Sequence, residues 1–320
     1  MRFSSIFKII ILNIFISKMA HAAVCEERYP ADSEECQYVQ ELEQKAEQGD
    51  ESAQFSLGSW YAEGRYVKPD YKLAIKWLEK AGKQGSDFSY FILGYHYNYG
   101  ENFPLSRQKA LEWYRRAAAQ GLAEAQDAIG VMFMQGEGVS QDYQQALAWY
   151  RKAARQGLPA AQTHLGIMSA FGRGVAQSDR QAIAWYRKAA KQDFAKAQYQ
   201  LGVAYSTGRG VPENSRNALK WYLKAAEQGF TPAQSALGEI YAHGRQGVPK
   251  DNKQAYIWYY MASIYTEKSK DDCSALIAER NRLKGTLTPD QLSETYAAFD
   301  LIRRKINQSK EAKKIARKKY

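Results

Sequence analysis

Three histidines after residue 22 are the side chains of this chain best suited to bind a metal or move a proton near neutral pH. They are His96, His164 and His243, and none has a metal-ligand neighbour at helical spacing. The sequence has no Gly-x-Ser-x-Gly motif, no phosphate-binding loop and no Cys-x-x-Cys pair. We therefore predict no catalytic residue, no metal site, no cofactor and no enzymatic activity.

Tryptophans could stack against a ligand, and six of them recur every 36 residues, with one inserted residue before the last. They are Trp77, Trp113, Trp149, Trp185, Trp221 and Trp258. Six copies at one register indicate a repeated packing position, so we interpret all six as buried core rather than as a ligand site. A period of this length predicts a solenoid.

Each repeat reads as two helices. Residues 123–135 predict the first, with Ala125, Ile129 and Phe133 on one face and Gly130 beside them, where the backbones can approach closely. The segment 136–139 contains two glycines and predicts the end of this first helix. The second helix begins at a residue whose side chain can cap it, in six copies: Asp70, Ser106, Asp142, Ser178, Asn214 and Asp251. Its apolar stripe is Ala146, Trp149, Tyr150, Ala153 and Ala154.

The recurring pairs Ala-Gln and Leu-Gly, with Gly-x-Gly-Val and Ala-x-x-Trp-Tyr, resemble the Sel-one-like repeat (SLR), a relative of the tetratricopeptide repeat, over residues 50–266. The resemblance implies an all-α fold, a right-handed α/α superhelical solenoid of six 36-residue helix-turn-helix repeats with capping helices. Tyr66 and Asn102 replace the second loop glycine, and Asp193 replaces the glycine after a second helix, so these turns are expected to differ. Family members are scaffolds that bind other proteins.

A comparison among the repeats indicates where such a partner would bind. One face of the first helix varies between repeats and carries irregular aromatic and aliphatic side chains, which are typical of protein-binding surfaces. The predicted partner-binding residues are Phe55, Phe91, Tyr95, Tyr99, Ile167, Phe171 and Tyr199. The alternative is that these side chains pack against the next repeat.

Residues 1–22 read as a cleavable signal peptide, with a basic start, a short apolar run and Ala20-His21-Ala22 as the cleavage site. A retained membrane anchor is the alternative. Export would place the chain in an oxidising compartment. We expect this compartment to be the periplasm, with the cell surface or the medium as alternatives. We then expect a Cys25–Cys36 disulfide that clamps an N-terminal cap, residues 23–49. Cys273 would be buried or available to a partner.

The cap includes a degenerate half-repeat at residues 37–48. Residues 267–320 are expected to form C-terminal capping helices and a basic tail. Residues 274–284 predict one helix, and Thr288-Pro289-Asp290 starts another, with a frayed end from residue 310. Its inward stripe is Leu292, Tyr296, Phe299, Ile302 and Ile306.

The net charge of +11 is concentrated at the two ends of the chain. Residues 1–22 hold three basic residues, and residues 303–320 hold nine basic residues and one acidic residue. The remaining 33 basic and 33 acidic residues balance, so nucleic-acid binding by the array is not supported. The tail could make a weak contact with an anionic membrane or an acidic partner, or it could be a solvated end.

In tetratricopeptide-like superhelices the first helices line the concave surface. These observations and the resemblance together predict a non-enzymatic, exported scaffold that binds a protein through this concave groove. Known exported members of the family include periplasmic immunity proteins against type VI secretion toxins such as phospholipases, and this role ranks first among specific ones. The alternatives are an envelope-associated adaptor and a host-protein-binding factor. A β-lactam-binding or hydrolysing enzyme ranks below them, because the sequence shows neither an activated serine nor a metal cluster.

Overall fold

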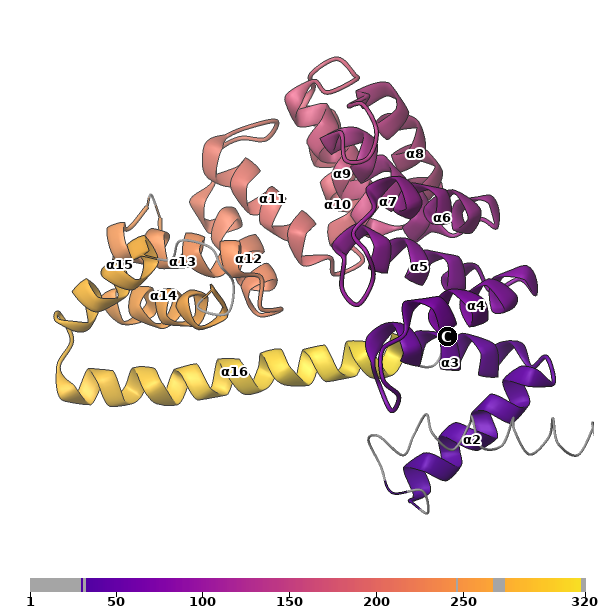
Figure 1. Ribbon diagram of the computed structural model, residues 1–320. Coiled ribbons are helices and arrows are strands. Elements are labelled where there is room, and N and C mark those ends of the chain that lie inside the picture. Colours follow the sequence, from indigo (N-terminus) through magenta and orange to yellow (C-terminus); the bar gives the residue numbers. More distant parts are fainter. Residues whose placement is uncertain (1–29, 31–32, 246, 267–273, 318–320) are drawn as a thin grey trace, which may run out of the picture. The chain divides into compact units, whose positions relative to one another are not determined.

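The predicted repeats are present as consecutive helix pairs in the computed structural model (Figure 1). The structure describes residues 30, 33–245, 247–266 and 274–317. These residues form fifteen helices and no strand, with one isolated bridge between Arg245 and Val248. The all-α solenoid-type array is therefore confirmed. The chain divides into two compact units, the first ending at Gln156 and the second beginning at Gly157.

The first unit contains a cap helix followed by three repeats, each a first and a second helix that pack together. Its helices are α2 (Glu34–Glu47), α3 (Glu51–Glu63), α4 (Tyr71–Lys83), α5 (Asp87–Tyr99), α6 (Arg107–Ala119), α7 (Ala123–Gln135) and α8 (Tyr143–Arg155). The bounds of α7 agree with the prediction from the sequence.

The second unit contains three further repeats and two C-terminal helices. Its helices are α9 (Pro159–Phe171), α10 (Asp179–Ala190), α11 (Ala195–Thr207), α12 (Ser215–Ala226), α13 (Thr231–His243), α14 (Asn252–Thr266), α15 (Ser274–Lys284) and α16 (Pro289–Arg317).

All six predicted caps of the second helices are present. Asp142 shows the pattern, since its Oδ1 accepts hydrogen bonds from the backbone N–H groups of Gln144 (2.8 Å) and Gln145 (3.0 Å). The other five accept in the same way from the first turn of their helices. Because the first N–H groups of a helix have no intrahelical acceptor, these caps fix where each second helix begins.

In the interface of each helix pair, a glycine of the first helix packs against a side chain of the second, which is Leu78 in repeat one and a tyrosine ring in the other five. A Cβ at Gly130 would lie only 2.6 Å from Cδ1 of Tyr150. The same contact joins Gly94, Gly166, Gly202 and Gly238 to Tyr114, Tyr186, Tyr222 and Tyr259. The predicted close approach is therefore confirmed, and these tyrosines, all buried, are the central core residues of the pairs.

The tryptophans are less uniform than predicted. Trp77, Trp113 and Trp258 are buried, but the other three, Trp149, Trp185 and Trp221, are only half-buried. A lysine one turn later covers each half-buried ring, with the Nζ of Lys152 lying 4.0 Å from the centroid of Trp149. The adjacent tyrosine takes the enclosed position, so the prediction of one buried register is wrong for these three.

A glutamine clamp ties successive repeats together. Nε2 of Gln156 donates to the carbonyl oxygen of Gly121 (2.7 Å) and to Oε1 of Gln126 (3.0 Å). Equivalent pairs join Gln84 to Gln54, Gln192 to Gln162 and Gln228 to Gln198. In these four repeats the glutamine of the Ala-Gln motif is thus buried with its amide oxygen accepting a bond, as burial of a polar group requires. By contrast, the amide oxygen of Gln234 in the last repeat has no hydrogen-bond partner among the described residues.

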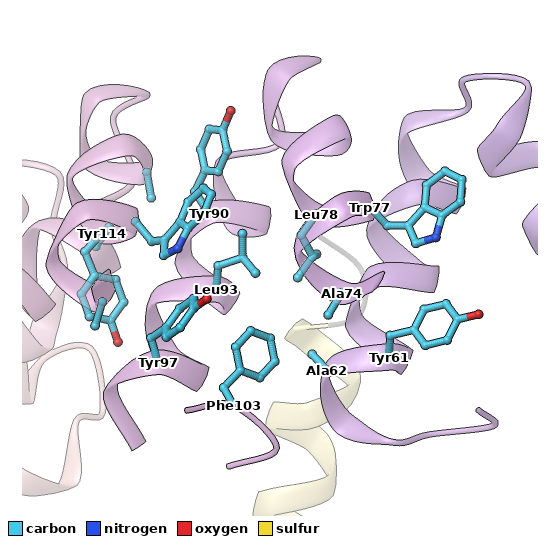
Figure 2. Packing of buried hydrophobic residues seen from close by; sticks show 14 of the residues in the cluster. Tyr61, Ala62, Ala74, Trp77, Leu78, Tyr90, Leu93, Tyr97, Phe103 and Tyr114 are labelled. Atoms are coloured by element: carbon cyan, nitrogen blue, oxygen red, sulfur yellow. The ribbon is translucent and has the colours of Figure 1, made fainter. Parts of the chain in front are cut away.

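Repeat two replaces this glutamine with Tyr90, and a second change accommodates it. The Tyr90 ring stacks on Trp113 and occupies the space where a Cβ at Gly82 would lie. Repeats two to five have alanine at the position of Gly82, and repeat six has Ser263. Figure 2 shows this core, with Leu78 and Leu93 pointing toward one another and Phe103 beside Tyr97.

The turns expected to differ keep the left-handed backbone. Tyr66, Asn102 and Asp193 have φ values of 63°, 59° and 58°. Side-chain hydrogen bonds hold two of these turns. Nδ2 of Asn102 donates to the Ala62 carbonyl (3.0 Å), and Oδ1 of Asp193 accepts from Nε2 of Gln198 (2.8 Å). Asparagine and aspartate tolerate this region better than other residues with a Cβ.

The C-terminal helices cover the last repeat, as predicted. Thr288 caps α16, accepting from the N–H of Gln291 while the Gln291 side chain accepts from the N–H of Thr288. Phe299 and Ile306 are buried, but Tyr296 is exposed at the edge of the stripe, and Thr295 takes the buried place beside it. The helix continues to Arg317, beyond the predicted fraying point at residue 310.

Candidate functional site

The first unit exposes a cluster of aromatic rings on α5. Tyr95 and Tyr99 are 40% and 60% exposed, and their ring centroids lie 4.6 Å apart. Phe88, near the start of the same helix, is also exposed, and its ring contacts that of Phe91. We call Phe88, Phe91, Tyr95 and Tyr99 the α5 aromatic surface.

Buried rings support this surface from below. Phe91 packs against Tyr114 with a centroid distance of 5.5 Å, and burial raises the pKa of Tyr114 well above its ordinary value. His96 is buried beneath Tyr95, stacked on Phe103 with its Nδ1 3.1 Å from the Glu101 carbonyl oxygen. The outer rings therefore rest on a packed layer, which limits how far they can move.

The electrostatic environment keeps Tyr95 neutral. Partial burial, the Glu101 carboxylate and the neighbouring Tyr99 together raise the pKa of Tyr95 above its usual value. The exposed pair therefore offers the neutral hydroxyl group of Tyr95 together with two apolar ring faces. This combination suits a protein interface, where a ring buries apolar area and its hydroxyl makes a hydrogen bond.

The second unit exposes a different surface. Phe171, the last residue of α9, is 57% exposed, and the guanidinium groups of Arg173 and Arg209 lie 5.4 and 5.7 Å from its ring centroid. Ile167 and Tyr199 are only partly exposed, and Tyr199 packs against Tyr222 and Phe230.

The predicted partner-binding residues thus fall into two groups. Tyr95, Tyr99 and Phe171 are exposed, whereas Phe55, Phe91, Ile167 and Tyr199 pack partly against the cores of their units. The packing alternative therefore has support for the second group. Tyr95 and Tyr99 belong to the first unit and Phe171 to the second. Their role in binding a partner stays a prediction.

One feature near Phe171 was not found from the sequence. A small pocket lies between α9, α10 and α11, with Arg209 at its edge. The sequence signal was available, because Ala204 stands at a position where the other repeats have larger side chains.

The residues with possible metal or redox chemistry lie apart. In the described part of the chain, no group of three or more histidines, cysteines or carboxylates could hold a metal ion. Cys36 is buried in the first turn of α2. Cys25 and Cys273 lie outside the described residues, so the predicted pairing stays a prediction. No helix within the described ranges has the length and apolar composition needed to cross a membrane.

Solved structures similar to this chain are repeat proteins of the same kind. A Sel1 repeat protein from Oxalobacter formigenes is 34% identical, with a TM-score of 0.62 over 71% of this chain and 99% of that one. The c5321 protein of uropathogenic Escherichia coli, a protective antigen with an SLR fold, is 27% identical, with a TM-score of 0.51 over 85% and 72% of the two chains.

Immunity protein Pa5087 from Pseudomonas aeruginosa is 22% identical, with a TM-score of 0.49 over 68% of this chain and 83% of that one. A likeness at that level carries no argument about function. No curated protein sequence matches this chain significantly.

The Sel1 repeat family model matches six consecutive segments of the chain, residues 51–86, 88–122, 123–158, 159–194, 195–230 and 231–263. These segments coincide with the helix pairs from α3 to α14, and the glycine, tyrosine and glutamine contacts recur among them. Arrays of this family are protein-interaction scaffolds and are in general not enzymes. The chain belongs to the Sel1 repeat family.

Proposed function

We propose that this chain is an exported, non-enzymatic scaffold that binds a protein partner through exposed side chains of its first helices. The observation that carries the proposal is the exposure of Tyr95 and Tyr99 on α5. Aromatic residues are enriched at the centres of protein interfaces because a ring buries a large apolar area with few rotatable bonds.

Packing within the fold does not account for these two rings. Repeat three has Val131 and Gln135 at the registers of Tyr95 and Tyr99, and repeat one has Ser59 and Glu63. The same helix pair therefore forms with small or polar side chains at both positions. A residue that the repeat does not need for folding, and that leaves apolar surface in water, is a candidate for partner binding.

Among specific roles we place first a periplasmic immunity protein against a type VI secretion toxin such as a phospholipase. Such a role needs an exported chain and a surface that occupies a toxin. The signal peptide expected at residues 1–22 and the α5 aromatic surface support it. The signal sequence lies outside the described residues, so export is part of the proposal.

The basic C-terminal helix supports a second candidate, an envelope-associated adaptor. Residues 303–320 hold nine basic residues and one acidic residue, and six of the nine basic residues lie within residues 307–320. Such a group can bind an anionic lipid surface or an acidic partner, with an affinity that falls as salt screens the charges.

Capture from the native periplasm distinguishes the two candidates. The bait proteins are the wild type, Tyr95→Ala/Tyr99→Ala, a deletion of residues 307–320, and Tyr38→Ala as a control, because Tyr38 is an exposed tyrosine of the same unit on α2. We expect the double variant to lose capture by about 30-fold or more, which corresponds to about 2 kcal/mol, with unchanged helicity and melting temperature. The Tyr38 control should retain capture.

Two results would reject the proposal. Loss of capture only with the deletion would favour the adaptor. Loss with the double variant accompanied by a large fall in melting temperature would mean that the two rings are structural.

A further inference from the structure

The second unit contains a pocket of about 80 Å³ between α9, α10 and α11. Its inner wall is apolar and buried, and is formed by Ala182, Ile183, Tyr186 and Ala204. The exposed Phe171 and Arg209 also line it, together with Gln200, Val203 and Asp179, the ion-pair partner of Arg209. The pocket therefore has an apolar interior, and its edge carries an aromatic ring and a paired arginine and aspartate.

The cause of the pocket is a missing side chain. Ala204 lies at a position that recurs every 36 residues along the first helices, and this position is buried in every repeat. Its counterparts are all larger: Trp60, His96, Met132, Met168 and Ile240. Protein interiors are close-packed, and an unfilled apolar space costs stability in proportion to its volume. The repeat keeps an alanine where five equivalents fill the space.

The size of the pocket limits what can enter. Cofactors and drug-sized ligands occupy sites of roughly 300–1,000 Å³. A volume several times smaller suits one aliphatic side chain, and the two charged residues that line the pocket, Asp179 and Arg209, already pair with each other. An anchoring leucine, isoleucine or methionine fits both constraints.

The charges at the edge indicate what should accompany that anchor. Arg209 is already engaged, since its Nη2 lies 3.0 Å from Oδ1 of Asp179 and donates to the Ala170 carbonyl (3.2 Å). Arg173 does not line the pocket, but its guanidinium lies 5.4 Å from the centroid of the Phe171 ring, which does. No ion pair joins Arg173 to a carboxylate of the described residues. An acidic group of a partner, placed beside the anchor, could therefore pair with Arg173.

We propose that this pocket is a recognition subsite for a protein segment in which an aliphatic residue adjoins an acidic one. The aliphatic side chain fills the space left by Ala204, and the carboxylate pairs with Arg173. The inference rests on the proposed scaffold function, but it concerns a surface separate from Tyr95 and Tyr99 and assigns the chemistry of the bound segment.

A selection of random linear peptides displayed on phage against the immobilised full chain tests this inference. We expect enrichment of leucine, isoleucine or methionine next to aspartate or glutamate. The most enriched sequence is then synthesised, and its affinity is measured by fluorescence polarisation with four variants.

Ala204→Met introduces the residue of repeats three and four and fills the pocket. We expect it to weaken peptide binding by about tenfold or more, with a melting temperature equal to or above that of the wild type. Arg173→Glu should weaken binding by roughly fivefold and remove the preference for an acidic residue. Arg151→Glu, a change of an exposed arginine on α8, and Tyr95→Ala/Tyr99→Ala should leave the peptide affinity unchanged.

The inference is wrong if no aliphatic–acidic pair is enriched, or if the selected peptide binds Ala204→Met and the wild type equally. Should Ala204→Met lower the melting temperature, Arg173→Glu decides, because its exposed side chain can change without disturbing the core. Failure of the peptide selection together with intact, Tyr95-dependent capture of a protein would reject this subsite and leave the scaffold function in place.

Discussion

Replacement of Gly130 by alanine sets two physical effects against each other. Helix propensity favours alanine over glycine by about 1 kcal/mol within a helix. However, the new methyl carbon would lie 2.6 Å from both Cδ1 and Cε1 of Tyr150, and 3.1 Å from Cζ. Carbon atoms normally rest about 3.5–4.0 Å apart, so the overlap approaches 1 Å at two ring atoms.

The ring has little freedom to move away. Tyr150 is 1% exposed and occupies the centre of the contact between α7 and α8. Overpacking of a core typically costs about 1–3 kcal/mol, and an immobile ring favours the upper part of that range. Subtraction of the propensity gain leaves an expected loss of about 1–2 kcal/mol from the free energy of unfolding.

Urea unfolding followed by far-ultraviolet circular dichroism measures the loss, and a double-mutant cycle with Tyr150→Ala assigns its cause. Without the ring, Gly130→Ala should be neutral or stabilising by up to about 1 kcal/mol. If Gly130→Ala stabilises the wild-type chain, or if its effect is the same in both backgrounds, the glycine–tyrosine contact is not what fixes the helix pair.

Three further predictions concern caps, tyrosines and cysteines. Asp142→Ala should lower the free energy of urea unfolding by about 1 kcal/mol, since two N–H groups lose their acceptor, whereas Asp142→Asn should retain most of the stability. Burial raises the pKa of Tyr222 and Tyr259 to about 12, so the unfolded chain, with ordinary values of 10.0, loses these protons first as the pH rises. Stability should therefore be complete below about pH 10 and fall between about pH 10 and 12, with loss of helicity accompanying tyrosinate absorbance; full helicity at the upper limit with all tyrosines ionised would contradict this. Mass mapping of exported protein should find Cys25 linked to Cys36 and Cys273 unpaired, and a link from Cys273 to either would refute the predicted cap.

The periodic part of the fold was predictable because its contacts recur: the caps in all six repeats, the glycine–tyrosine contact in five and the glutamine clamp in four. The glycine column, the capping residues and the bounds of α7 follow from residue spacing alone, since helical geometry fixes which side chains share a face. The partner across the interface was harder to assign. Spacing placed Trp149 and Tyr150 on the same stripe, and only the structure shows that the tyrosine takes the buried place.

The departures from the repeat were the least predictable part, since each depends on a contact with another element. Gly82 is required by the Tyr90 ring, and Asn102 keeps its turn through a bond to Ala62. The pocket beside Ala204 follows from a missing volume between three helices. The candidate surface was predicted in part. The positions that vary between repeats could be read from the sequence, but the exposed fraction of each aromatic side chain could not.

The central claim is that the α5 aromatic surface contacts a protein partner in the cell. Its most direct test is photo-crosslinking, with benzoylphenylalanine placed at Tyr99 in one strain and at Tyr38 in another. The two side chains are 60% and 55% exposed in the same unit, so they differ in position rather than in access. The proposed function predicts one discrete adduct from position 99 and none from position 38. Adducts of equal yield at both positions, or none at position 99, would contradict it.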